Sequence, residues 1–219
     1  MWAYARVDTV KDTVMLTLMR KAGFRWLGIG IESASKHVRD GVEKGRFGND
    51  EIIAAVRRVQ SHDLAVAANY IFGLPDDTEE SMQQTLDLAI TINAEMSNFY
   101  CAMPYPGSPL HRQISATKPW LLPEYRGYGG LDGEARNTGP GWIGYSQHAY
   151  ETLPLPTEAL TAHQILDFRD FAFEAYFSSN RYQAMLVERF GTTALDEVLK
   201  MLSKGRPRRA HREFPRNSF

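Results

Sequence analysis

The first hundred residues alternate between apolar, strand-like segments and amphipathic helical patterns. The strand-like segments cover residues 2–7, 24–31, 64–72 and 97–102. The segments between them carry apolar side chains at helical spacing, as at Ile52, Val56 and Val59. Helices between successive strands form crossover connections, so the pattern predicts an α/β fold with a parallel sheet and right-handed crossovers.

Polar residues indicate where these helices begin. Asp8 starts a stretch in which Val14 and Leu18 share one side of a helix. A short helix is expected over residues 35–42. Asn49 or Asp50 is expected to cap the next helix, because short polar side chains accept hydrogen bonds from the first backbone N–H groups.

The pattern changes after Pro104. Pro, Gly and aromatic residues dominate up to Pro156 with little periodicity, which predicts a long segment packed on the barrel. Helical patterns return over residues 157–177, 182–190 and 193–202. From residue 204 onward, several arginines lie among Pro and Gly, which is typical of a solvated tail. We therefore predict four parts: a partial (β/α) barrel over 1–110, an irregular covering segment over 111–156, an α-helical C-terminal extension over 157–203, and a basic, flexible tail over 204–219.

Composition narrows the class of protein. With 43% hydrophobic residues, the chain is long enough to bury a sizeable core, and a formal charge of −1 gives no global field that would attract nucleic acid. No apolar run approaches the ~20 residues of a membrane span, and the N-terminus lacks the basic and apolar regions of a signal peptide. The single cysteine excludes an intramolecular disulfide and is consistent with the cytoplasm, where we expect the protein to reside.

The first candidate site lies at the end of the second predicted strand. The segment 28–33, Gly-Ile-Gly-Ile-Glu-Ser, places the Glu32 carboxylate and the Ser33 hydroxyl at the carboxyl end of a buried parallel strand. Ligands bind at this edge in α/β sheets and barrels, and a carboxylate there accepts hydrogen bonds from a diol or an ammonium group. The alternative is that both residues cap the helix that begins near Ser35.

The second candidate site follows the next strand. Ile71 would offer an apolar face to a planar ring, and Gly73 would leave room beside it. The alternative is an ordinary turn before a helix capped by Asp77 and Glu80, and both interpretations are compatible. After the fourth strand, the segment 104–109 forms a rigid turn with an exposed Tyr105.

These segments resemble radical S-adenosylmethionine (SAM) enzymes. Three motifs occur in the order seen in that family. They are the strand ending in Gly-Ile-Glu-Ser (30–33), the strand ending in Ile-Phe-Gly-Leu-Pro (71–75) and the segment Pro-Tyr-Pro-Gly-Ser-Pro-Leu (104–110). The chain is most similar to the subgroup that usually carries an N-terminal cobalamin-binding domain, whose members methylate unactivated carbons or build rings and lipids. The C-terminal segments 142–147 and 168–177 are similar to the tail of that subgroup.

The resemblance implies roles for individual residues. Glu32 and Ser33 match positions that hold the SAM ribose or amino group, and Ile71 and Gly73 match the motif that lines the adenine, with Asn69 nearby. The resemblance further implies that Arg6 contacts the SAM carboxylate. Tyr105 and Pro106 would border the same pocket or the substrate cavity.

One departure from the family is chemical. The family binds a four-iron, four-sulfur cluster with a Cys-x3-Cys-x2-Cys loop, whereas this chain has Cys101 alone and six scattered histidines. We therefore predict no metal site and assign no catalytic residue in this chain. Four strands do not close a barrel, so residues 2–7 should form an exposed edge, and the chain should represent the C-terminal part of a longer enzyme.

These features predict a radical SAM family protein that is inactive as this chain alone. The full-length relative would cleave SAM with its cluster for methylation or ring formation, and the cluster and any cobalamin would belong to that relative or to an N-terminal partner chain with the cysteine loop. The substrate would be a small or lipid-like molecule. The first alternative is a non-catalytic module that binds a SAM-like nucleoside or serves as a scaffold. The least favoured alternative is an unrelated barrel enzyme that acts on a phosphorylated metabolite, because the chain offers no Gly-rich phosphate loop.

Overall fold

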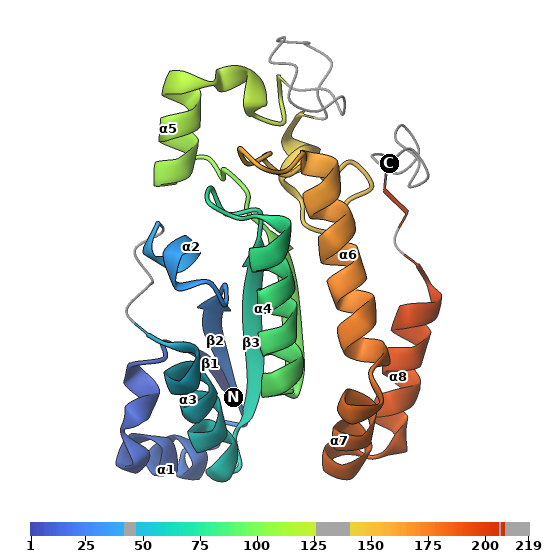
Figure 1. Cartoon of the computed structure of the whole chain (residues 1–219). Coiled ribbons are helices and arrows are strands. Elements are labelled where there is room, and N and C mark those ends of the chain that lie inside the picture. Colours follow the sequence, from blue (N-terminus) through green and yellow to red (C-terminus); the bar gives the residue numbers. More distant parts are fainter. Residues whose placement is uncertain (42–46, 126–140, 206, 209–219) are drawn as a thin grey trace. The chain divides into compact units, whose positions relative to one another are not determined.

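The computed structural model describes residues 1–41, 47–125, 141–205 and 207–208 (Figure 1). The chain forms two compact units, which are described separately. The first comprises Met1–Ile71, Glu80–Phe99 and Ala172–Lys204, and the second comprises Phe72–Glu79, Tyr100–Phe171 and the C-terminal segment from Gly205. Most of the predicted basic tail, residues 209–219, lies outside the described residues.

A four-stranded parallel sheet organises the fold. Its strands are β1 (Trp2–Ala5), β2 (Trp26–Glu32), β3 (Ala65–Phe72) and β4 (Met96–Cys101), in the spatial order β1-β2-β3-β4. Strand β2 pairs in parallel with both β1 and β3, and Gly28 lies opposite Tyr4 on one side and Ala67 on the other. The predicted α/β fold with a partial parallel barrel is confirmed, and β1 lies at one edge of the sheet as expected.

Helices connect the strands and bury one face of the sheet. The connecting elements are the 3₁₀ helix η1 (Thr9–Lys11), α1 (Thr13–Lys21), α2 (Lys36–Asp40), α3 (Asn49–Ser61) and α4 (Glu79–Ile92). Figure 1 shows α3 and α4 in front of the strands. Residues that face the helices alternate along β2 and β3 with residues of the opposite face. The helix side holds the buried side chains Leu27, Ile29, Val66 and Ala68. The opposite face holds Trp26, Gly30, Ala67 and Asn69, which are at least partly exposed. We call this second side the open face of the sheet.

Two predicted helix starts are wrong. The first helix begins at Thr13 because the Asp12 carboxylate, rather than Asp8, accepts hydrogen bonds from the N–H groups of residues 14 and 15 at 2.9 and 3.1 Å. A separate 3₁₀ turn precedes it, which turns the helix so that Leu16 is buried while Val14 and Leu18 are 66% and 59% exposed. Helix α3 is capped at Gly48, whose N–H donates to the Glu51 carboxylate at 2.9 Å.

A buried carboxylate connects the start of β4 with helix α7 in the first unit. The C-terminal helices are α6 (Ala162–Ser178), whose residues are divided between the two units, α7 (Asn180–Phe190) and α8 (Thr192–Ser203). No helix of the described residues is long and apolar enough to span a membrane. The Glu95 carboxylate accepts a hydrogen bond from the Val66 N–H at 2.7 Å and pairs with Arg189 of α7. The Tyr182 hydroxyl donates to the Glu95 carbonyl at 3.2 Å, so the start of β4 and helix α7 form one connected structure.

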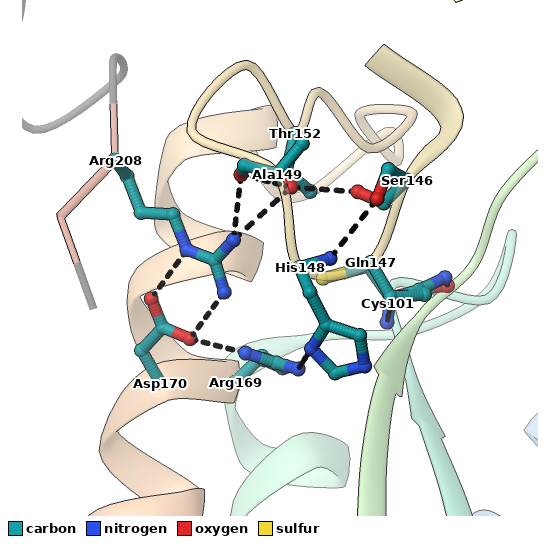
Figure 2. Close-up of polar contacts among 9 residues, drawn as sticks. All are labelled: Cys101, Ser146, Gln147, His148, Ala149, Thr152, Arg169, Asp170 and Arg208. Carbon is teal, nitrogen blue, oxygen red and sulfur yellow. Dashed lines mark hydrogen bonds and ion pairs between the residues drawn. The ribbon is translucent and has the colours of Figure 1, made fainter. Parts of the chain in front are cut away.

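The second unit contains helix α5 (Pro109–Thr117) and the 3₁₀ helices η2 (Pro119–Leu121) and η3 (Gly141–Tyr145). Its interior holds a charged cluster in which Asp170 of α6 pairs with Arg169 and Arg208 (Figure 2). Arg208 is 3% exposed, and its guanidinium also donates to the Ala149 carbonyl at 2.8 Å. The expectation that the arginines from residue 204 onward are solvated is therefore wrong for Arg208, because a buried carboxylate lies within reach of it.

Candidate functional site

A pocket of about 430 Å³ lies at the carboxyl ends of β1 and β2. Three residues singled out in the sequence, Arg6, Glu32 and Asn69, line it together. They come from the end of β1, the end of β2 and the middle of β3, and the sheet brings them together because its three strands run in parallel. The pocket has the size of a small-molecule site, for which roughly 300–1,000 Å³ is typical.

The Glu32 carboxylate is held by an irregular backbone. A β-bulge interrupts the pairing of β2 with β3 between Gly30 and Glu32, and the backbone of Glu32 is left-handed, with φ of 70°. The carboxylate lies against Gly30, where a Cβ atom would be only 2.6 Å from Glu32 Oε1. Bulges and left-handed non-glycine residues are enriched at functional sites because they redirect side chains at an energetic cost.

Glu32 is more enclosed than its place at a strand end suggests. Its residue is 6% exposed although it lines the pocket. A buried carboxylate interacts more strongly with a bound cation or hydroxyl than an exposed one, because less water competes for it. The enclosed position of Glu32 therefore favours specific contacts with a ligand.

Arg6 and Asn69 offer polar groups of different kinds to the same pocket. The Arg6 side chain is 68% exposed, and its Nε donates to Asp8 at 3.3 Å. The Asn69 Oδ1 accepts a hydrogen bond from Asn98 Nδ2 at 2.9 Å, which holds the carboxamide on the open face. The pocket thus combines a carboxylate, a guanidinium and a carboxamide.

Sequence reasoning missed Arg39, which also lines this pocket. Arg39 is 2% exposed, and its guanidinium donates to the carbonyls of Ser33 and Phe47 and to Asn49 Oδ1. Burial lowers its pKa from the ordinary value. In the sequence Arg39 is one of several charged residues of a short helix, so its burial depends on carbonyl groups that only the folded chain brings to it.

The other predicted site residues of the first unit, Ser33 and Ile71, lie in different surroundings. The Ser33 side chain is fully buried, with its Oγ 3.2 Å from the hydroxyl oxygen of Thr85 on α4. Ile71 is half-buried and is not among the residues that line the pocket. The proposed contacts of both residues with SAM stay predictions.

Gly73, Tyr105 and Pro106 belong to the second unit. Gly73 has φ of 77°, and a Cβ atom there would be 2.7 Å from the Ile165 side chain. The Tyr105 hydroxyl accepts a hydrogen bond from Gln147 Nε2 at 3.2 Å, and the Gln147 amide also pairs with the backbone of Cys101 through two 2.9 Å hydrogen bonds. Pro106 is exposed. The assigned roles of these residues in ligand binding stay predictions.

The described residues do not fit an iron–sulfur cluster. Cys101 is buried, and desolvation raises the pKa of its thiol to about 12, so the thiol stays protonated near neutral pH. Within the described ranges, no group of three or more His, Cys, Asp or Glu side chains is placed to hold a metal ion. The described residues therefore offer no set of thiolates for such a cluster.

Comparison with known protein families matches residues 6–89 to the radical SAM superfamily. An uncharacterized methyltransferase of Pyrococcus horikoshii is 30% identical over 130 residues, which cover 59% of this chain and 28% of the relative. The bacteriochlorophyllide d C-12(1)-methyltransferase of Chlorobaculum tepidum is 29% identical over 97 residues, 44% of this chain and 21% of that enzyme. The anaerobic magnesium-protoporphyrin IX monomethyl ester cyclase of Rubrivivax gelatinosus is 28% identical over 107 residues, 49% of this chain and 19% of the cyclase.

A solved structure agrees with these matches at the level of the fold. The radical SAM methyltransferase TsrM of Kitasatospora setae, determined with cobalamin and a [4Fe-4S] cluster bound, superimposes with a TM-score of 0.54 and 14% sequence identity. The alignment covers 91% of this chain and 44% of TsrM. The chain therefore spans less than half of the length of each of these relatives. Residues 6–89 of the chain thus match the radical SAM superfamily, and the parallel four-stranded sheet that they help to form agrees with that match.

Proposed function

We propose that this chain supplies the SAM-binding part of a radical SAM enzyme and that SAM binds in the pocket beside Glu32. The observation that carries the proposal is the convergence of Arg6, Glu32 and Asn69 on one pocket at the carboxyl ends of parallel strands. The polar groups of the pocket are complementary to those of SAM. SAM carries an ammonium group, a carboxylate and a ribose diol, and the pocket offers a carboxylate, a guanidinium and a carboxamide to them.

Each side chain has a distinct part in this proposal. Glu32 accepts hydrogen bonds from the ribose hydroxyls or the ammonium group, which a buried carboxylate binds strongly. Arg6 pairs with the SAM carboxylate, and its 68% exposed side chain is accessible to the ligand. Asn69 contributes a carboxamide from the adjacent strand and is held by Asn98.

The proposal extends to the reaction class of a complete enzyme. The relatives are named as methyltransferases and a cyclase, which supports methylation or ring formation on a small molecule. Cobalamin is present in the TsrM structure and is the assisting group that we propose for such a reaction. The described residues do not fit a four-iron, four-sulfur cluster, so the cluster would be held by cysteines outside this chain.

A second candidate function is a non-catalytic module that binds SAM or a related nucleoside. The buried, single Cys101 favours it, because the pocket offers polar groups to a nucleoside while the chain holds one cysteine for a cluster that needs three. The two functions differ in turnover. After incubation of the chain with iron, sulfide and a strong reductant, formation of 5′-deoxyadenosine from SAM would contradict the non-catalytic module.

Calorimetric titration of the 219-residue chain with SAM tests the site. We expect Glu32→Gln to weaken SAM binding by at least about tenfold, because a hydrogen bond to a charged group contributes roughly 1.5–3 kcal/mol and 1.4 kcal/mol corresponds to tenfold. Glu79→Gln is the matched control, since Glu79 is exposed at the start of α4. If Glu32→Gln folds normally by circular dichroism and binds SAM within about twofold of the wild type, the pocket is not the SAM site.

A further inference from the structure

We propose that a second pocket on the open face of the sheet binds the substrate and that this substrate is an uncharged, planar aromatic molecule. The inference deepens the proposed function and rests on it. The pocket has a volume of about 360 Å³. Strands β1 to β4 all contribute to its lining, which comprises Trp2, Tyr4, Trp26, Gly28, Ala67, Asn69 and Asn98.

Aromatic rings form the walls of this pocket. Trp2 and Tyr4 contact each other edge to face, with ring centroids 5.0 Å apart, yet they are 62% and 74% exposed. Trp26 stacks on Phe190 with an interplanar angle of 9° and a centroid distance of 5.8 Å, which fixes its ring orientation. Clustered aromatic surface of this kind marks a binding site more often than a solvated face.

Gly28 determines where one wall lies. A Cβ atom at Gly28 would be 2.7 Å from the Tyr4 ring, so the ring packs directly on the backbone of β2. Any larger residue would push the ring out of this position. The glycine therefore sets the position of one aromatic wall.

Two carboxamides supply the polar part of the lining. Asn98 Nδ2 donates to Asn69 Oδ1 at 2.9 Å, and the Asn69 Nδ2 is 3.5 Å from the Ile29 carbonyl. Within the described residues the Asn98 Oδ1 accepts no hydrogen bond from the protein, so it is available to a ligand N–H or O–H group. A heteroaromatic ring with a hydrogen-bond donor matches this arrangement.

The charge of the lining restricts the ligand further. All the residues that line the pocket are uncharged. A ligand carboxylate or phosphate would lose its hydration here without gaining a cationic partner, which is costly. The pocket therefore selects neutral aromatic molecules over anionic ones.

The position of the pocket connects it with the proposed SAM site. Tyr4 and Asn69 line both pockets, so the two sites share a wall. A substrate bound against the aromatic rings would lie next to SAM, as a reaction between the two molecules requires.

The test uses two probes that differ in one group, indole-3-carboxamide and indole-3-carboxylate. Their affinities for the 219-residue chain are measured by ligand-observed NMR titration in the presence of SAM. We expect the carboxamide to bind at least about tenfold more tightly than the carboxylate. We expect Asn98→Leu, which keeps the side-chain volume, to weaken carboxamide binding by roughly fivefold to tenfold.

Controls separate this inference from the proposed function. Asn180→Leu changes an exposed asparagine at the start of α7 and should leave the affinity for the carboxamide unchanged. The affinity for SAM is measured on every variant. Equal binding of the two probes, no binding of either, or an unchanged affinity of Asn98→Leu would overturn the aromatic substrate site even if SAM binds normally. A failure of SAM binding with intact selectivity for the carboxamide would instead contradict the proposed function.

Discussion

Removal of the Asp170 charge should be among the most destabilising single changes in the second unit. Asp170 Oδ2 accepts a hydrogen bond from Arg208 Nε at 3.0 Å, and Oδ1 is 2.5 Å from an Arg169 nitrogen (Figure 2). The three side chains are only 1–3% exposed. In Asp170→Asn the amide N–H₂ faces guanidinium donors, and two buried positive charges lose their carboxylate.

The magnitude follows from the burial of the cluster. Breaking a buried ion pair by removing one partner costs about 3–5 kcal/mol, because the remaining charge is left without compensation. With a urea m-value of about 1–3 kcal/mol per molar, the unfolding midpoint should fall by roughly 1–5 M. Asp87→Asn is the matched control, because Asp87 is exposed on α4, and it should change the free energy of unfolding by less than about 0.5 kcal/mol.

The same carboxylate predicts a dependence of stability on pH. Burial alone would raise the pKa of Asp170, but the hydrogen bonds and charges of Arg208 and Arg169 outweigh it and lower the pKa below its ordinary value. A group with a lowered folded-state pKa stabilises the protein fully above its unfolded pKa of about 4, and this contribution is lost as the pH falls through the folded-state pKa. The difference between wild type and Asp170→Asn should therefore shrink in acid.

Urea titrations followed by circular dichroism at pH 7 and at decreasing pH measure both effects. Hydrogen exchange of residues 146–152 adds a local reading, because Arg208 donates to the Ala149 carbonyl and to the Thr152 hydroxyl. A loss below about 1 kcal/mol at pH 7, or a loss that is the same at every pH, would mean that the Asp170 carboxylate does not compensate buried charges.

Two further predictions concern the second unit. Gly73→Ala should lower the free energy of unfolding by about 2–4 kcal/mol, because the backbone of residue 73 is left-handed and the added Cβ would contact Ile165. Gly107→Ala is the control, because residue 107 also has a left-handed backbone, with φ of 85°, but no atom lies within 4 Å of the added Cβ. It should lower the free energy of unfolding by only about 1–2 kcal/mol. Equal losses in urea denaturation would contradict the steric argument. Burial raises the thiol pKa of Cys101 to about 12, so Cys101 should react with iodoacetamide at pH 8 only after denaturation. The label is detected by mass spectrometry, and rapid labelling of the native chain would contradict the burial of Cys101.

The candidate site was predictable to the extent that it depends on strand order. Arg6, Glu32 and Asn69 follow or lie within strand-like segments, and parallel strands present such residues along one edge and face of a sheet. Arg39 was not predictable, because its guanidinium is buried by carbonyl groups of residues 33 and 47. The aromatic pocket was also missed, since Trp2 and Trp26 look like ordinary strand residues until the sheet places them together.

The order of strands and helices and the parallel sheet could be predicted from the chain, because they depend on the local spacing of apolar and polar residues, and the family resemblance rests on the motifs at 30–33, 71–75 and 104–110. Which side chains lie together depends on the tertiary fold. The left-handed backbone of Glu32 and the bulge beside it turn its carboxylate onto Gly30, and local periodicity carries no record of that turn. Arg208 reads as part of a solvated tail, but it is buried because Asp170, 38 residues earlier, offers it a carboxylate inside the fold. Charge burial depends on such distant partners, since an unpaired charge in the interior costs more than any local preference supplies.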